Sequence, residues 1–287
     1  MTTASDEPAD TVATLAQARR LLAEGRLDEA RELLLIEAFV KRDEPELQTA
    51  YLELIPPTPT LLEIQAESYD DLRDPDVKVR LKAATRITRE CTKVYPRHSV
   101  RWMRDPRATA PLMQAAASDP DAKVADKALQ ALTCILCSYF PDQRALPVLL
   151  SRLKDSRQEA RASAIGGLGC LRREELLEPL VDLLERGTER DRDLVVAVVS
   201  GLAYETEANM RQLPIRWSPQ GRRRWVARMA AALGDGTASI RRSAAVALKH
   251  FMDPSALPTL RAARPNESDP TIAHFIDDAI KTLEALG

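Results

Sequence analysis

Residues 155–168 read DSRQEARASAIGGL, and residues 235–248 read DGTASIRRSAAVAL. Both stretches begin with Asp, place an apolar or small residue five positions later, a small residue at nine and Leu at thirteen. Steps of four keep these residues on one face of an α-helix, and the small residue lets a second helix approach closely. The Asp stands where it can cap the helix and interact with its dipole. The pattern predicts helices that pack against one another along one face.

The pattern occurs at least five times, and a sixth copy near Asp269 fits after a shift of one residue. We expect its apolar positions to be buried, in particular Val79, Val124, Leu132, Leu168, Leu202, Ile240 and Leu248. The five copies are Asp74, Val79, Ala83 and Ile87; Asp119, Val124, Ala128 and Leu132; Asp155, Ala160, Ala164 and Leu168; Glu189, Leu194, Val198 and Leu202; and Asp235, Ile240, Ala244 and Leu248.

An apolar stretch with a proline precedes most copies, for example Pro111, Pro147, Pro179 and Pro258. Each repeat is therefore predicted to be a pair of helices, A and then B. With the Asp between the helices and an Arg six residues after it, these pairs resemble the HEAT repeat family over about residues 58–287. The resemblance implies an all-α solenoid of about six helical hairpins stacked with a right-handed twist, with A helices on the convex side and B helices on the concave side.

In such repeats the arginines usually bond to the acidic residues between repeats. We therefore expect Arg80, Arg161 and Arg241 to have a structural role. The second and fourth copies lack this arginine, because Ala125 and Val195 stand in its place. The resemblance implies nothing about chemistry, since such solenoids mostly bind other macromolecules.

Residues 11–57 differ from the repeats. They predict two amphipathic helices joined at Gly25, in a turn that resembles a tetratricopeptide hairpin, and the prolines of residues 56–59 end this segment. We expect a disordered tail over residues 1–10, an N-terminal helical hairpin or cap over residues 11–57 and the solenoid over residues 58–287.

Composition limits the class of protein. The 287 residues carry a net charge of −2, so the protein lacks the strong positive field with which a protein coats nucleic acid. Aromatic residues make up only 4% of the chain. No apolar run approaches the roughly 18 residues that span a bilayer, and residues 1–10 are polar rather than a signal peptide. Four cysteines do not suggest a disulfide framework. These features favour a cytoplasmic protein.

Two repeats are longer than the others by about ten residues, and the additions fall at residues 91–106 and 204–219. All three tryptophans and many arginines lie in or just after them. Arginine and tryptophan are enriched in binding hot spots, so these segments are candidates for contact with a partner. The alternative is that the tryptophans cover core and the arginines are solvated. The candidate residues are Arg97, Arg101, Trp102, Arg104, Arg216, Trp217, Arg222, Arg223, Arg224 and Trp225.

Catalytic and metal motifs are largely missing from the sequence. Cys134 and Cys137 form a CxxC pair, but the pair lies in an apolar helical run without a nearby His, where Cys behaves as a core residue. The sequence contains no HExxH, GxSxG or glycine-rich phosphate loop. We expect no cofactor and no metal.

Three functions are compatible with these observations. The leading hypothesis is a non-catalytic protein-protein interaction scaffold or adaptor that binds an acidic protein or peptide through the concave face and the two Arg/Trp segments. The alternative is a nucleic-acid-binding or base-repair HEAT-like protein, which also uses Trp and Arg to hold bases and phosphates. A weaker third is a relative of the lyases that attach bilins, since many bacterial HEAT-like repeats resemble them. The oligomeric state and the membership of residues 11–57 in a binding site stay open.

Overall fold

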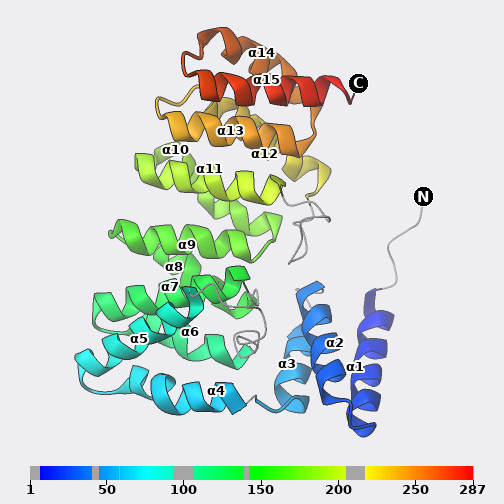
Figure 1. The fold of residues 1–287 in the computed structure, drawn as a ribbon, viewed down its shortest axis with the longest axis vertical. Coiled ribbons are helices and arrows are strands. Elements are labelled where there is room, and N and C mark those ends of the chain that lie inside the picture. The colour runs from blue at the N-terminus through cyan, green and yellow to red at the C-terminus, as the bar shows by residue number, and fades with distance from the viewer. Residues whose placement is uncertain are drawn as a thin grey trace. The chain divides into compact units, whose positions relative to one another are not determined.

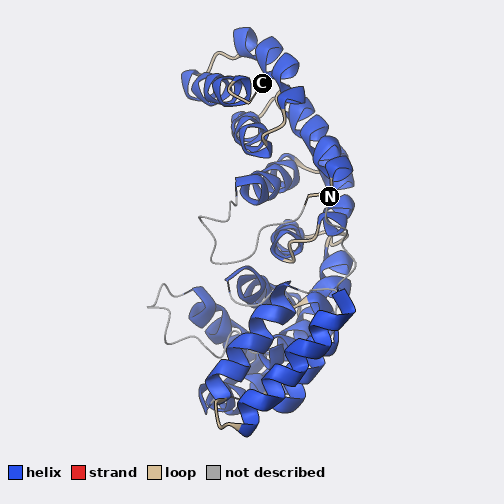
Figure 2. Cartoon of the chain, turned by 90° about the vertical axis from the view of Figure 1, so that its right-hand side faces the viewer, coloured by secondary structure: helices blue, strands red, loops and turns tan. Residues whose placement is uncertain are grey.

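The chain is helical throughout the parts that the computed structural model describes. These are residues 7–40, 45–57, 59–92, 106–138, 142–204 and 217–286. They contain helices α1 to α15 and several short 3-10 turns, and no strand (Figures 1 and 2). The predicted all-α solenoid is thereby confirmed. The contacts between residues divide the chain into two compact units, Met1–Val148 and Leu149–Gly287.

Three helices precede the first repeat, where the sequence predicted two. The turn after α1 uses Gly25 at a φ of +75°, which favours glycine, and Arg26 N donates to the carbonyl of Leu21 at 2.8 Å. Pro45 begins the additional helix, a position that suits proline because its missing N–H would have no partner there. The helices are α1 (Glu7–Ala23), α2 (Leu27–Val40) and α3 (Pro45–Leu54).

The α1–α3 segment packs around its own core and is bonded to the repeats of the same unit. Leu34, Leu47 and Tyr51 are among the buried residues that the three helices share. Arg107, which the sequence placed just after the first long insertion, donates to the carbonyls of Leu52 and Ile55 at 2.6 and 2.5 Å. The arginine thus satisfies carbonyls at the C-terminal end of α3, where the helix dipole is negative.

A buried carboxylate makes a second link between α3 and the repeats. Asp142 is 1% exposed and accepts hydrogen bonds from Gln48 Nε2 at 3.0 Å and from Thr109 Oγ1. The guanidinium of Arg144 lies 2.7 Å from the same carboxylate. Because Gln48 and Thr109 come from different helices, the contact fixes α3 against the first turn of α6.

Six helical hairpins follow, as predicted. Within each unit the B helices pack in order along the chain, α5 against α7 in the first and α9, α11, α13 and α15 in the second (Figure 1). The hairpins are α4 (Pro59–Ile64) with α5 (Val77–Thr92), α6 (Thr109–Ser118) with α7 (Ala122–Ser138), α8 (Leu146–Arg152) with α9 (Gln158–Cys170), α10 (Val181–Arg186) with α11 (Glu189–Tyr204), α12 (Pro219–Ala232) with α13 (Ala238–Phe251), and α14 (Leu257–Ala263) with α15 (Pro270–Glu284).

Short helical turns lead into most A helices or lengthen them. In the first hairpin a π-helical turn and a 3-10 turn follow α4, and Tyr69 there donates its hydroxyl to the carbonyl of Ala108 at 2.9 Å. The turns are η1 (Gln65–Tyr69), η2 (Asp71–Arg73), η4 (Pro106–Ala108), η5 (Gln143–Ala145), η6 (Glu174–Leu180), η8 (Pro254–Ala256) and η9 (Arg264–Asn266).

Most of the predicted core positions are buried. Val79 is the exception, because it lies in the N-terminal turn of α5 and is half-buried. The buried ones are Val124, Leu132, Leu168, Leu202, Ile240 and Leu248.

The predicted structural role of the arginines is also confirmed. Arg80 Nε donates to Asp119 Oδ2 at 2.8 Å, and Arg80 Nη1 donates to the carbonyl of Asp74 at 2.8 Å. Arg241 repeats this geometry with Glu267 at 2.7 Å and with the carbonyl of Asp235. Each arginine thus closes the turn between its own A and B helices and bonds the acidic residue of the next repeat.

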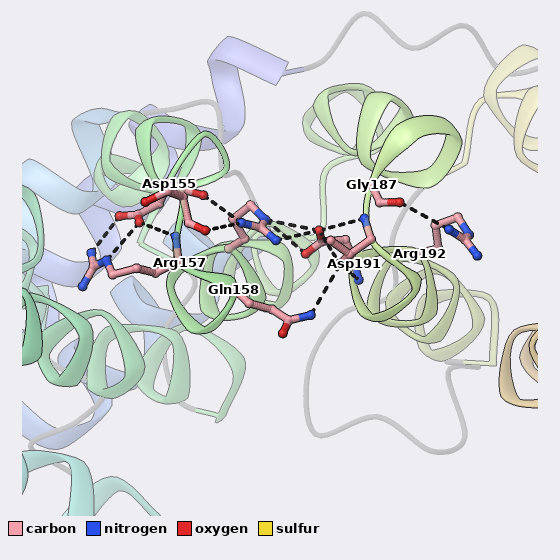
Figure 3. A network of polar contacts seen from close by, with 9 residues as sticks. Asp155, Arg157, Gln158, Gly187, Asp191 and Arg192 are labelled. Atoms are coloured by element: carbon pink, nitrogen blue, oxygen red, sulfur yellow. Dashed lines mark hydrogen bonds and ion pairs between the residues drawn. The ribbon is translucent and has the colours of Figure 1, made fainter.

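In the fourth repeat the predicted alignment is wrong, because the pattern begins three residues earlier than the predicted start at Glu189. Arg161 bonds Asp191 at 2.9 Å, and Arg192 bonds Asp235 at 3.1 Å, so Arg192 is the arginine that we expected to be missing. Arg192 also donates to the carbonyl of Gly187 (Figure 3). Val195, placed by the sequence at the arginine position, is fully buried. The acidic residue of this repeat is Asp191, which is 1% exposed and occupies a position that is apolar or small in other copies. The corrected copy of the pattern therefore begins at residue 186.

Asp155 obtains its arginines locally. The preceding repeat has Ala125 instead of the arginine, and Asp155 is bonded by Arg157 at 2.7 Å (Figure 3). Arg152 bonds the same carboxylate at 2.9 Å. The hydrogen bond from the Arg157 side chain holds the pKa of Asp155 far below its ordinary value. Arg241 likewise lowers the pKa of Glu267. Burial opposes the ionisation of Asp191, but hydrogen bonds from Arg161 and Thr188 outweigh it and lower the pKa.

These shifts predict a loss of stability in acid. A carboxyl whose pKa is lower in the folded than in the unfolded chain stabilises the fold above its ordinary pKa, 3.8 for Asp191 and 4.5 for Glu267. The stabilisation is lost as the pH falls through the lower folded value. We expect the melting temperature to drop as the pH falls from about 4.5 towards 2. Thermal unfolding followed by circular dichroism measures it, and Arg161→Ala should reduce the dependence. An equal dependence in Arg161→Ala would show that this pair does not contribute.

The packing predicts that Leu132→Ala destabilises the protein by about 2–5 kcal/mol, because the residue is fully buried in α7 and its removal leaves a cavity. Urea unfolding gives the free energy. Gln130→Ala, an exposed change on the same helix, is the matched control and should stay within about 0.5 kcal/mol of the wild type. Equal effects of the two changes would contradict the assigned core.

Candidate protein-binding surfaces

The start of α12 carries the described part of the second Arg/Trp segment. Ser218 caps the helix, since its Oγ accepts from Gly221 N at 2.9 Å. Glu174 of η6 accepts from Ser218 N and Oγ at 2.5 and 2.9 Å. A Cβ at Gly221 would lie 1.6 Å from Glu174 Oε1, so the glycine leaves room for this carboxylate. The start of α12 is therefore fixed to the preceding repeat.

Three consecutive arginines follow, and Arg222, Arg223 and Arg224 are all exposed. The first turn of α12 itself holds no acidic residue, and the Glu174 carboxylate bonded at its N-cap is the negative charge beside the positive end of the helix dipole. Arg224 lies 3.7 Å from Glu174. Within the described residues, Arg222 and Arg223 form no ion pair. Arg223 also lines a shallow groove with Ala227 of α12 and with Ser255 and Thr259 of the next repeat.

Trp225 is a core residue, contrary to its place among the candidate contacts. It is 1% exposed and shares the buried face of α12 with Val226 and Met229. The Arg228 guanidinium lies 5.0 Å from the ring centroid, and Arg228 pairs with Glu178 at 3.0 Å. The helical period puts Trp225 four residues after buried Gly221 and four before Met229, so the ring faces inward. We therefore remove Trp225 from the candidate surface.

Trp217 is partly accessible. Its ring meets that of buried Phe251 edge to face, with centroids 5.1 Å apart. At the ends of the neighbouring B helices, Tyr204 lies against His250 with centroids 4.6 Å apart and is 51% exposed. Burial, followed by the charge of Lys249, lowers the pKa of His250, which favours its neutral form. Exposed aromatic surface therefore lies at the end of α11, on Tyr204, beside the half-buried ring of His250.

The remaining candidate contacts lie outside the described residues. They are Arg97, Arg101, Trp102, Arg104 and Arg216.

Cys134, the first cysteine of the CxxC pair in α7, is half-buried, so it agrees only in part with the expected core position. Cys134 Sγ donates to the carbonyl of buried Cys91 at 3.1 Å. A hydrogen bond with Cys134 and burial raise the pKa of Cys91. In the ranges that the structure describes, no three His, Cys, Asp or Glu side chains are grouped so that they could hold a metal ion. Among the same residues no helix has both the length and the apolar character needed to cross a bilayer.

Family models identify the repeats. The model for HEAT repeats matches residues 109–200, and the model for the PBS lyase HEAT-like repeat matches residues 240–263. Together with the hairpins and the arginine contacts, these matches support a helical solenoid with HEAT repeats over the matched residues. No curated protein matches the chain.

Solved structures show the same fold at low sequence identity. A crystal structure of an engineered protein has a TM-score of 0.58 at 15% identity and covers 80% of this chain and 98% of its own. A designed armadillo repeat protein in complex with the peptide (KR)4 has a TM-score of 0.59 at 15% identity, covering 78% and 99%. Another designed armadillo repeat protein has a TM-score of 0.56 at 15% identity, covering 78% and 99%.

The two described tryptophans should respond differently to truncation. Trp225→Ala removes a fully buried ring and should cost about 3–5 kcal/mol of unfolding free energy. Trp217→Ala should cost clearly less, because part of that ring is already in contact with solvent. Chemical denaturation of both variants measures the difference. Equal losses would show that Trp217 is core as well.

Proposed function

We propose that this HEAT-repeat protein is a non-catalytic interaction scaffold or adaptor that binds an acidic protein or peptide. The binding surface consists of exposed positions on the B helices together with the two Arg/Trp segments. The repeat scaffold itself is well suited to this, because its structural contacts occupy one face of each helix and leave the other free to vary.

The observation that carries the proposal is the exposed arginine cluster of α12. Arg222 and Arg223 are exposed and have no ion pair among the described residues. An acidic side chain of a partner would supply the ion pair that these two arginines lack. Exposed Tyr204 and half-buried Trp217 add the rigid apolar surface that interface hot spots use.

The designed neighbours give limited support. One of these armadillo repeat proteins was solved in complex with the basic peptide (KR)4. A solenoid of related fold thus accepts a peptide, while the charge of that peptide is the opposite of the one proposed for this chain.

Nucleic-acid binding is the second candidate, because the same arginines could hold phosphates and the aromatic rings could stack on bases. It would require a steep fall of affinity with salt. The net charge of −2 favours a protein partner.

Charge reversal distinguishes these functions. A partner captured from native lysate and identified by mass spectrometry should bind Arg222→Glu with Arg223→Glu more weakly by on the order of 2 kcal/mol in titration calorimetry. Arg186→Glu with Arg261→Glu changes the net charge equally at exposed positions and is the control. Unchanged binding in the first variant would exclude this cluster. Saturable RNA or DNA binding that the first variant abolishes would favour the second candidate.

A further inference from the structure

The first two B helices carry lysines at equivalent positions. Lys78 and Lys82 stand four and eight residues after Asp74, and Lys123 and Lys127 stand four and eight after Asp119. In each helix the residue that follows a lysine belongs to the repeat pattern and faces the core side, for example buried Ala83 and buried Val124. The lysines therefore share one side of the layer that α5 and α7 form.

Direct contacts hold α5 and α7 side by side within the first unit. Thr88 Oγ1 of α5 donates to the carbonyl of Lys127 at 3.0 Å, and Cys134 Sγ of α7 donates to the carbonyl of Cys91 at 3.1 Å. Arg80 at the start of α5 bonds Asp119, just before α7, at 2.8 Å. The four lysines thus form a single surface, here called the α5–α7 lysine face.

Within the described residues the amines of this face have no ion-pair partner, although the carboxylates of Asp76 and Asp121 accept from the backbone N–H groups of Lys78 and Lys123. Lys78, Lys82 and Lys123 are exposed and make no ion pair in the part of the chain that the structure describes. The Lys127 amine donates to Gln130 at 3.0 Å, and an amide adds no negative charge. Like charges four residues apart destabilise a helix, so Lys78 with Lys82 and Lys123 with Lys127 are unfavourable in the free protein. Together the two helices hold seven basic and two acidic residues.

The equivalent positions of later repeats are different. Four and eight residues along the pattern stand Glu159 and Ser163 in α9, and Ser239 and Ser243 in α13. The lysines are therefore not required by the repeat itself.

We propose that the α5–α7 lysine face binds an acidic polypeptide segment in extended conformation. This inference rests on the proposed function and assigns it a surface in the first unit, apart from the arginines of α12. Residues four apart on a helix rise by about 6 Å, and alternate side chains of an extended chain are about 6.6 Å apart. Carboxylates at every second residue of the segment therefore match the spacing of Lys78 and Lys82.

The composition of the face favours a peptide over nucleic acid. Neither α5 nor α7 contains an aromatic residue, so bases would find no ring on which to stack. Lysine also lacks the planar fork with which arginine grips phosphate in two bonds. Carboxylates on a peptide need only the point charges that the four amines provide.

Fluorescence anisotropy with a labelled peptide of alternating Glu and Ala tests the proposal on the full chain. Lys82→Gln with Lys123→Gln should weaken binding about fivefold or more, and Lys82→Arg with Lys123→Arg should restore most of it. The control Lys154→Gln with Lys281→Gln removes the same charge from exposed positions of the second unit. Circular dichroism verifies that all variants are folded.

Each outcome has a separate meaning. The inference is supported if Lys82→Gln with Lys123→Gln weakens peptide binding and the control variant does not. Equal weakening in the control variant would show a general charge effect and would overturn the inference. If the peptide binds but only the charge reversal at Arg222 and Arg223 weakens it, the inference fails and the proposed function stands. If the wild type does not bind the peptide, the inference and the preference for acidic partners both fail. If the wild type binds single-stranded oligothymidylate and Lys82→Gln with Lys123→Gln abolishes that binding, the face is assigned to nucleic acid instead.

Discussion

The bond between an arginine of one repeat and an acidic residue of the next is the constraint on which the stacking of B helices within each unit depends. Apolar burial drives the helices together, but it has no direction and tolerates sliding along a face of small and branched residues. Arg80, Arg192 and Arg241 each bond a carbonyl of their own turn as well as the next acidic residue. A shift of one helix past the next would break both sets of bonds and leave charges unpaired in a largely enclosed position. The arginine therefore determines the register in which the apolar faces meet.

The fourth repeat shows how strong this constraint is. No acidic residue stands at its turn, where Arg186 and Gly187 lie, and the carboxylate is instead supplied by Asp191 from inside α11. An aspartate that is 1% exposed would be costly without partners. Arg161 and Thr188 supply them, at 2.9 and 2.8 Å. The structure thus gives up an apolar core position to keep the bond between repeats.

The sequence predicted the repeats because Asp155, Arg161 and Ala164 have fixed spacings that follow from helix geometry. It misaligned the fourth because α11 is apolar on more than one side, so Leu194 and Val198 fit the offsets as well as buried Val195 and Val199 do. Only the contact of Arg192 with Asp235, which needs two helices in place, separates the alignments. The same limit applies to the site. The run of arginines places Arg222 on the surface, in agreement with the structure. Residue type alone also places Trp225 in a binding surface, but its spacing of four residues from Gly221 and from Met229 puts it on the buried face of α12.

Buried and solvent-facing positions of the B helices follow different constraints, so repeats with the same core can carry different surfaces. Buried positions repeat from copy to copy, since Ala83, Ala128, Ala164 and Ala244 must all admit a neighbouring helix. The positions directly before these alanines carry Lys82, Lys127, Ser163 and Ser243, which are exposed or half-buried and have no common chemistry. The arginines between repeats have acidic partners within the fold, so packing accounts for them. Lys82 of α5 and Arg222 and Arg223 of α12 are exposed and have no such partner among the described residues, so neither packing nor the repeat pattern accounts for them.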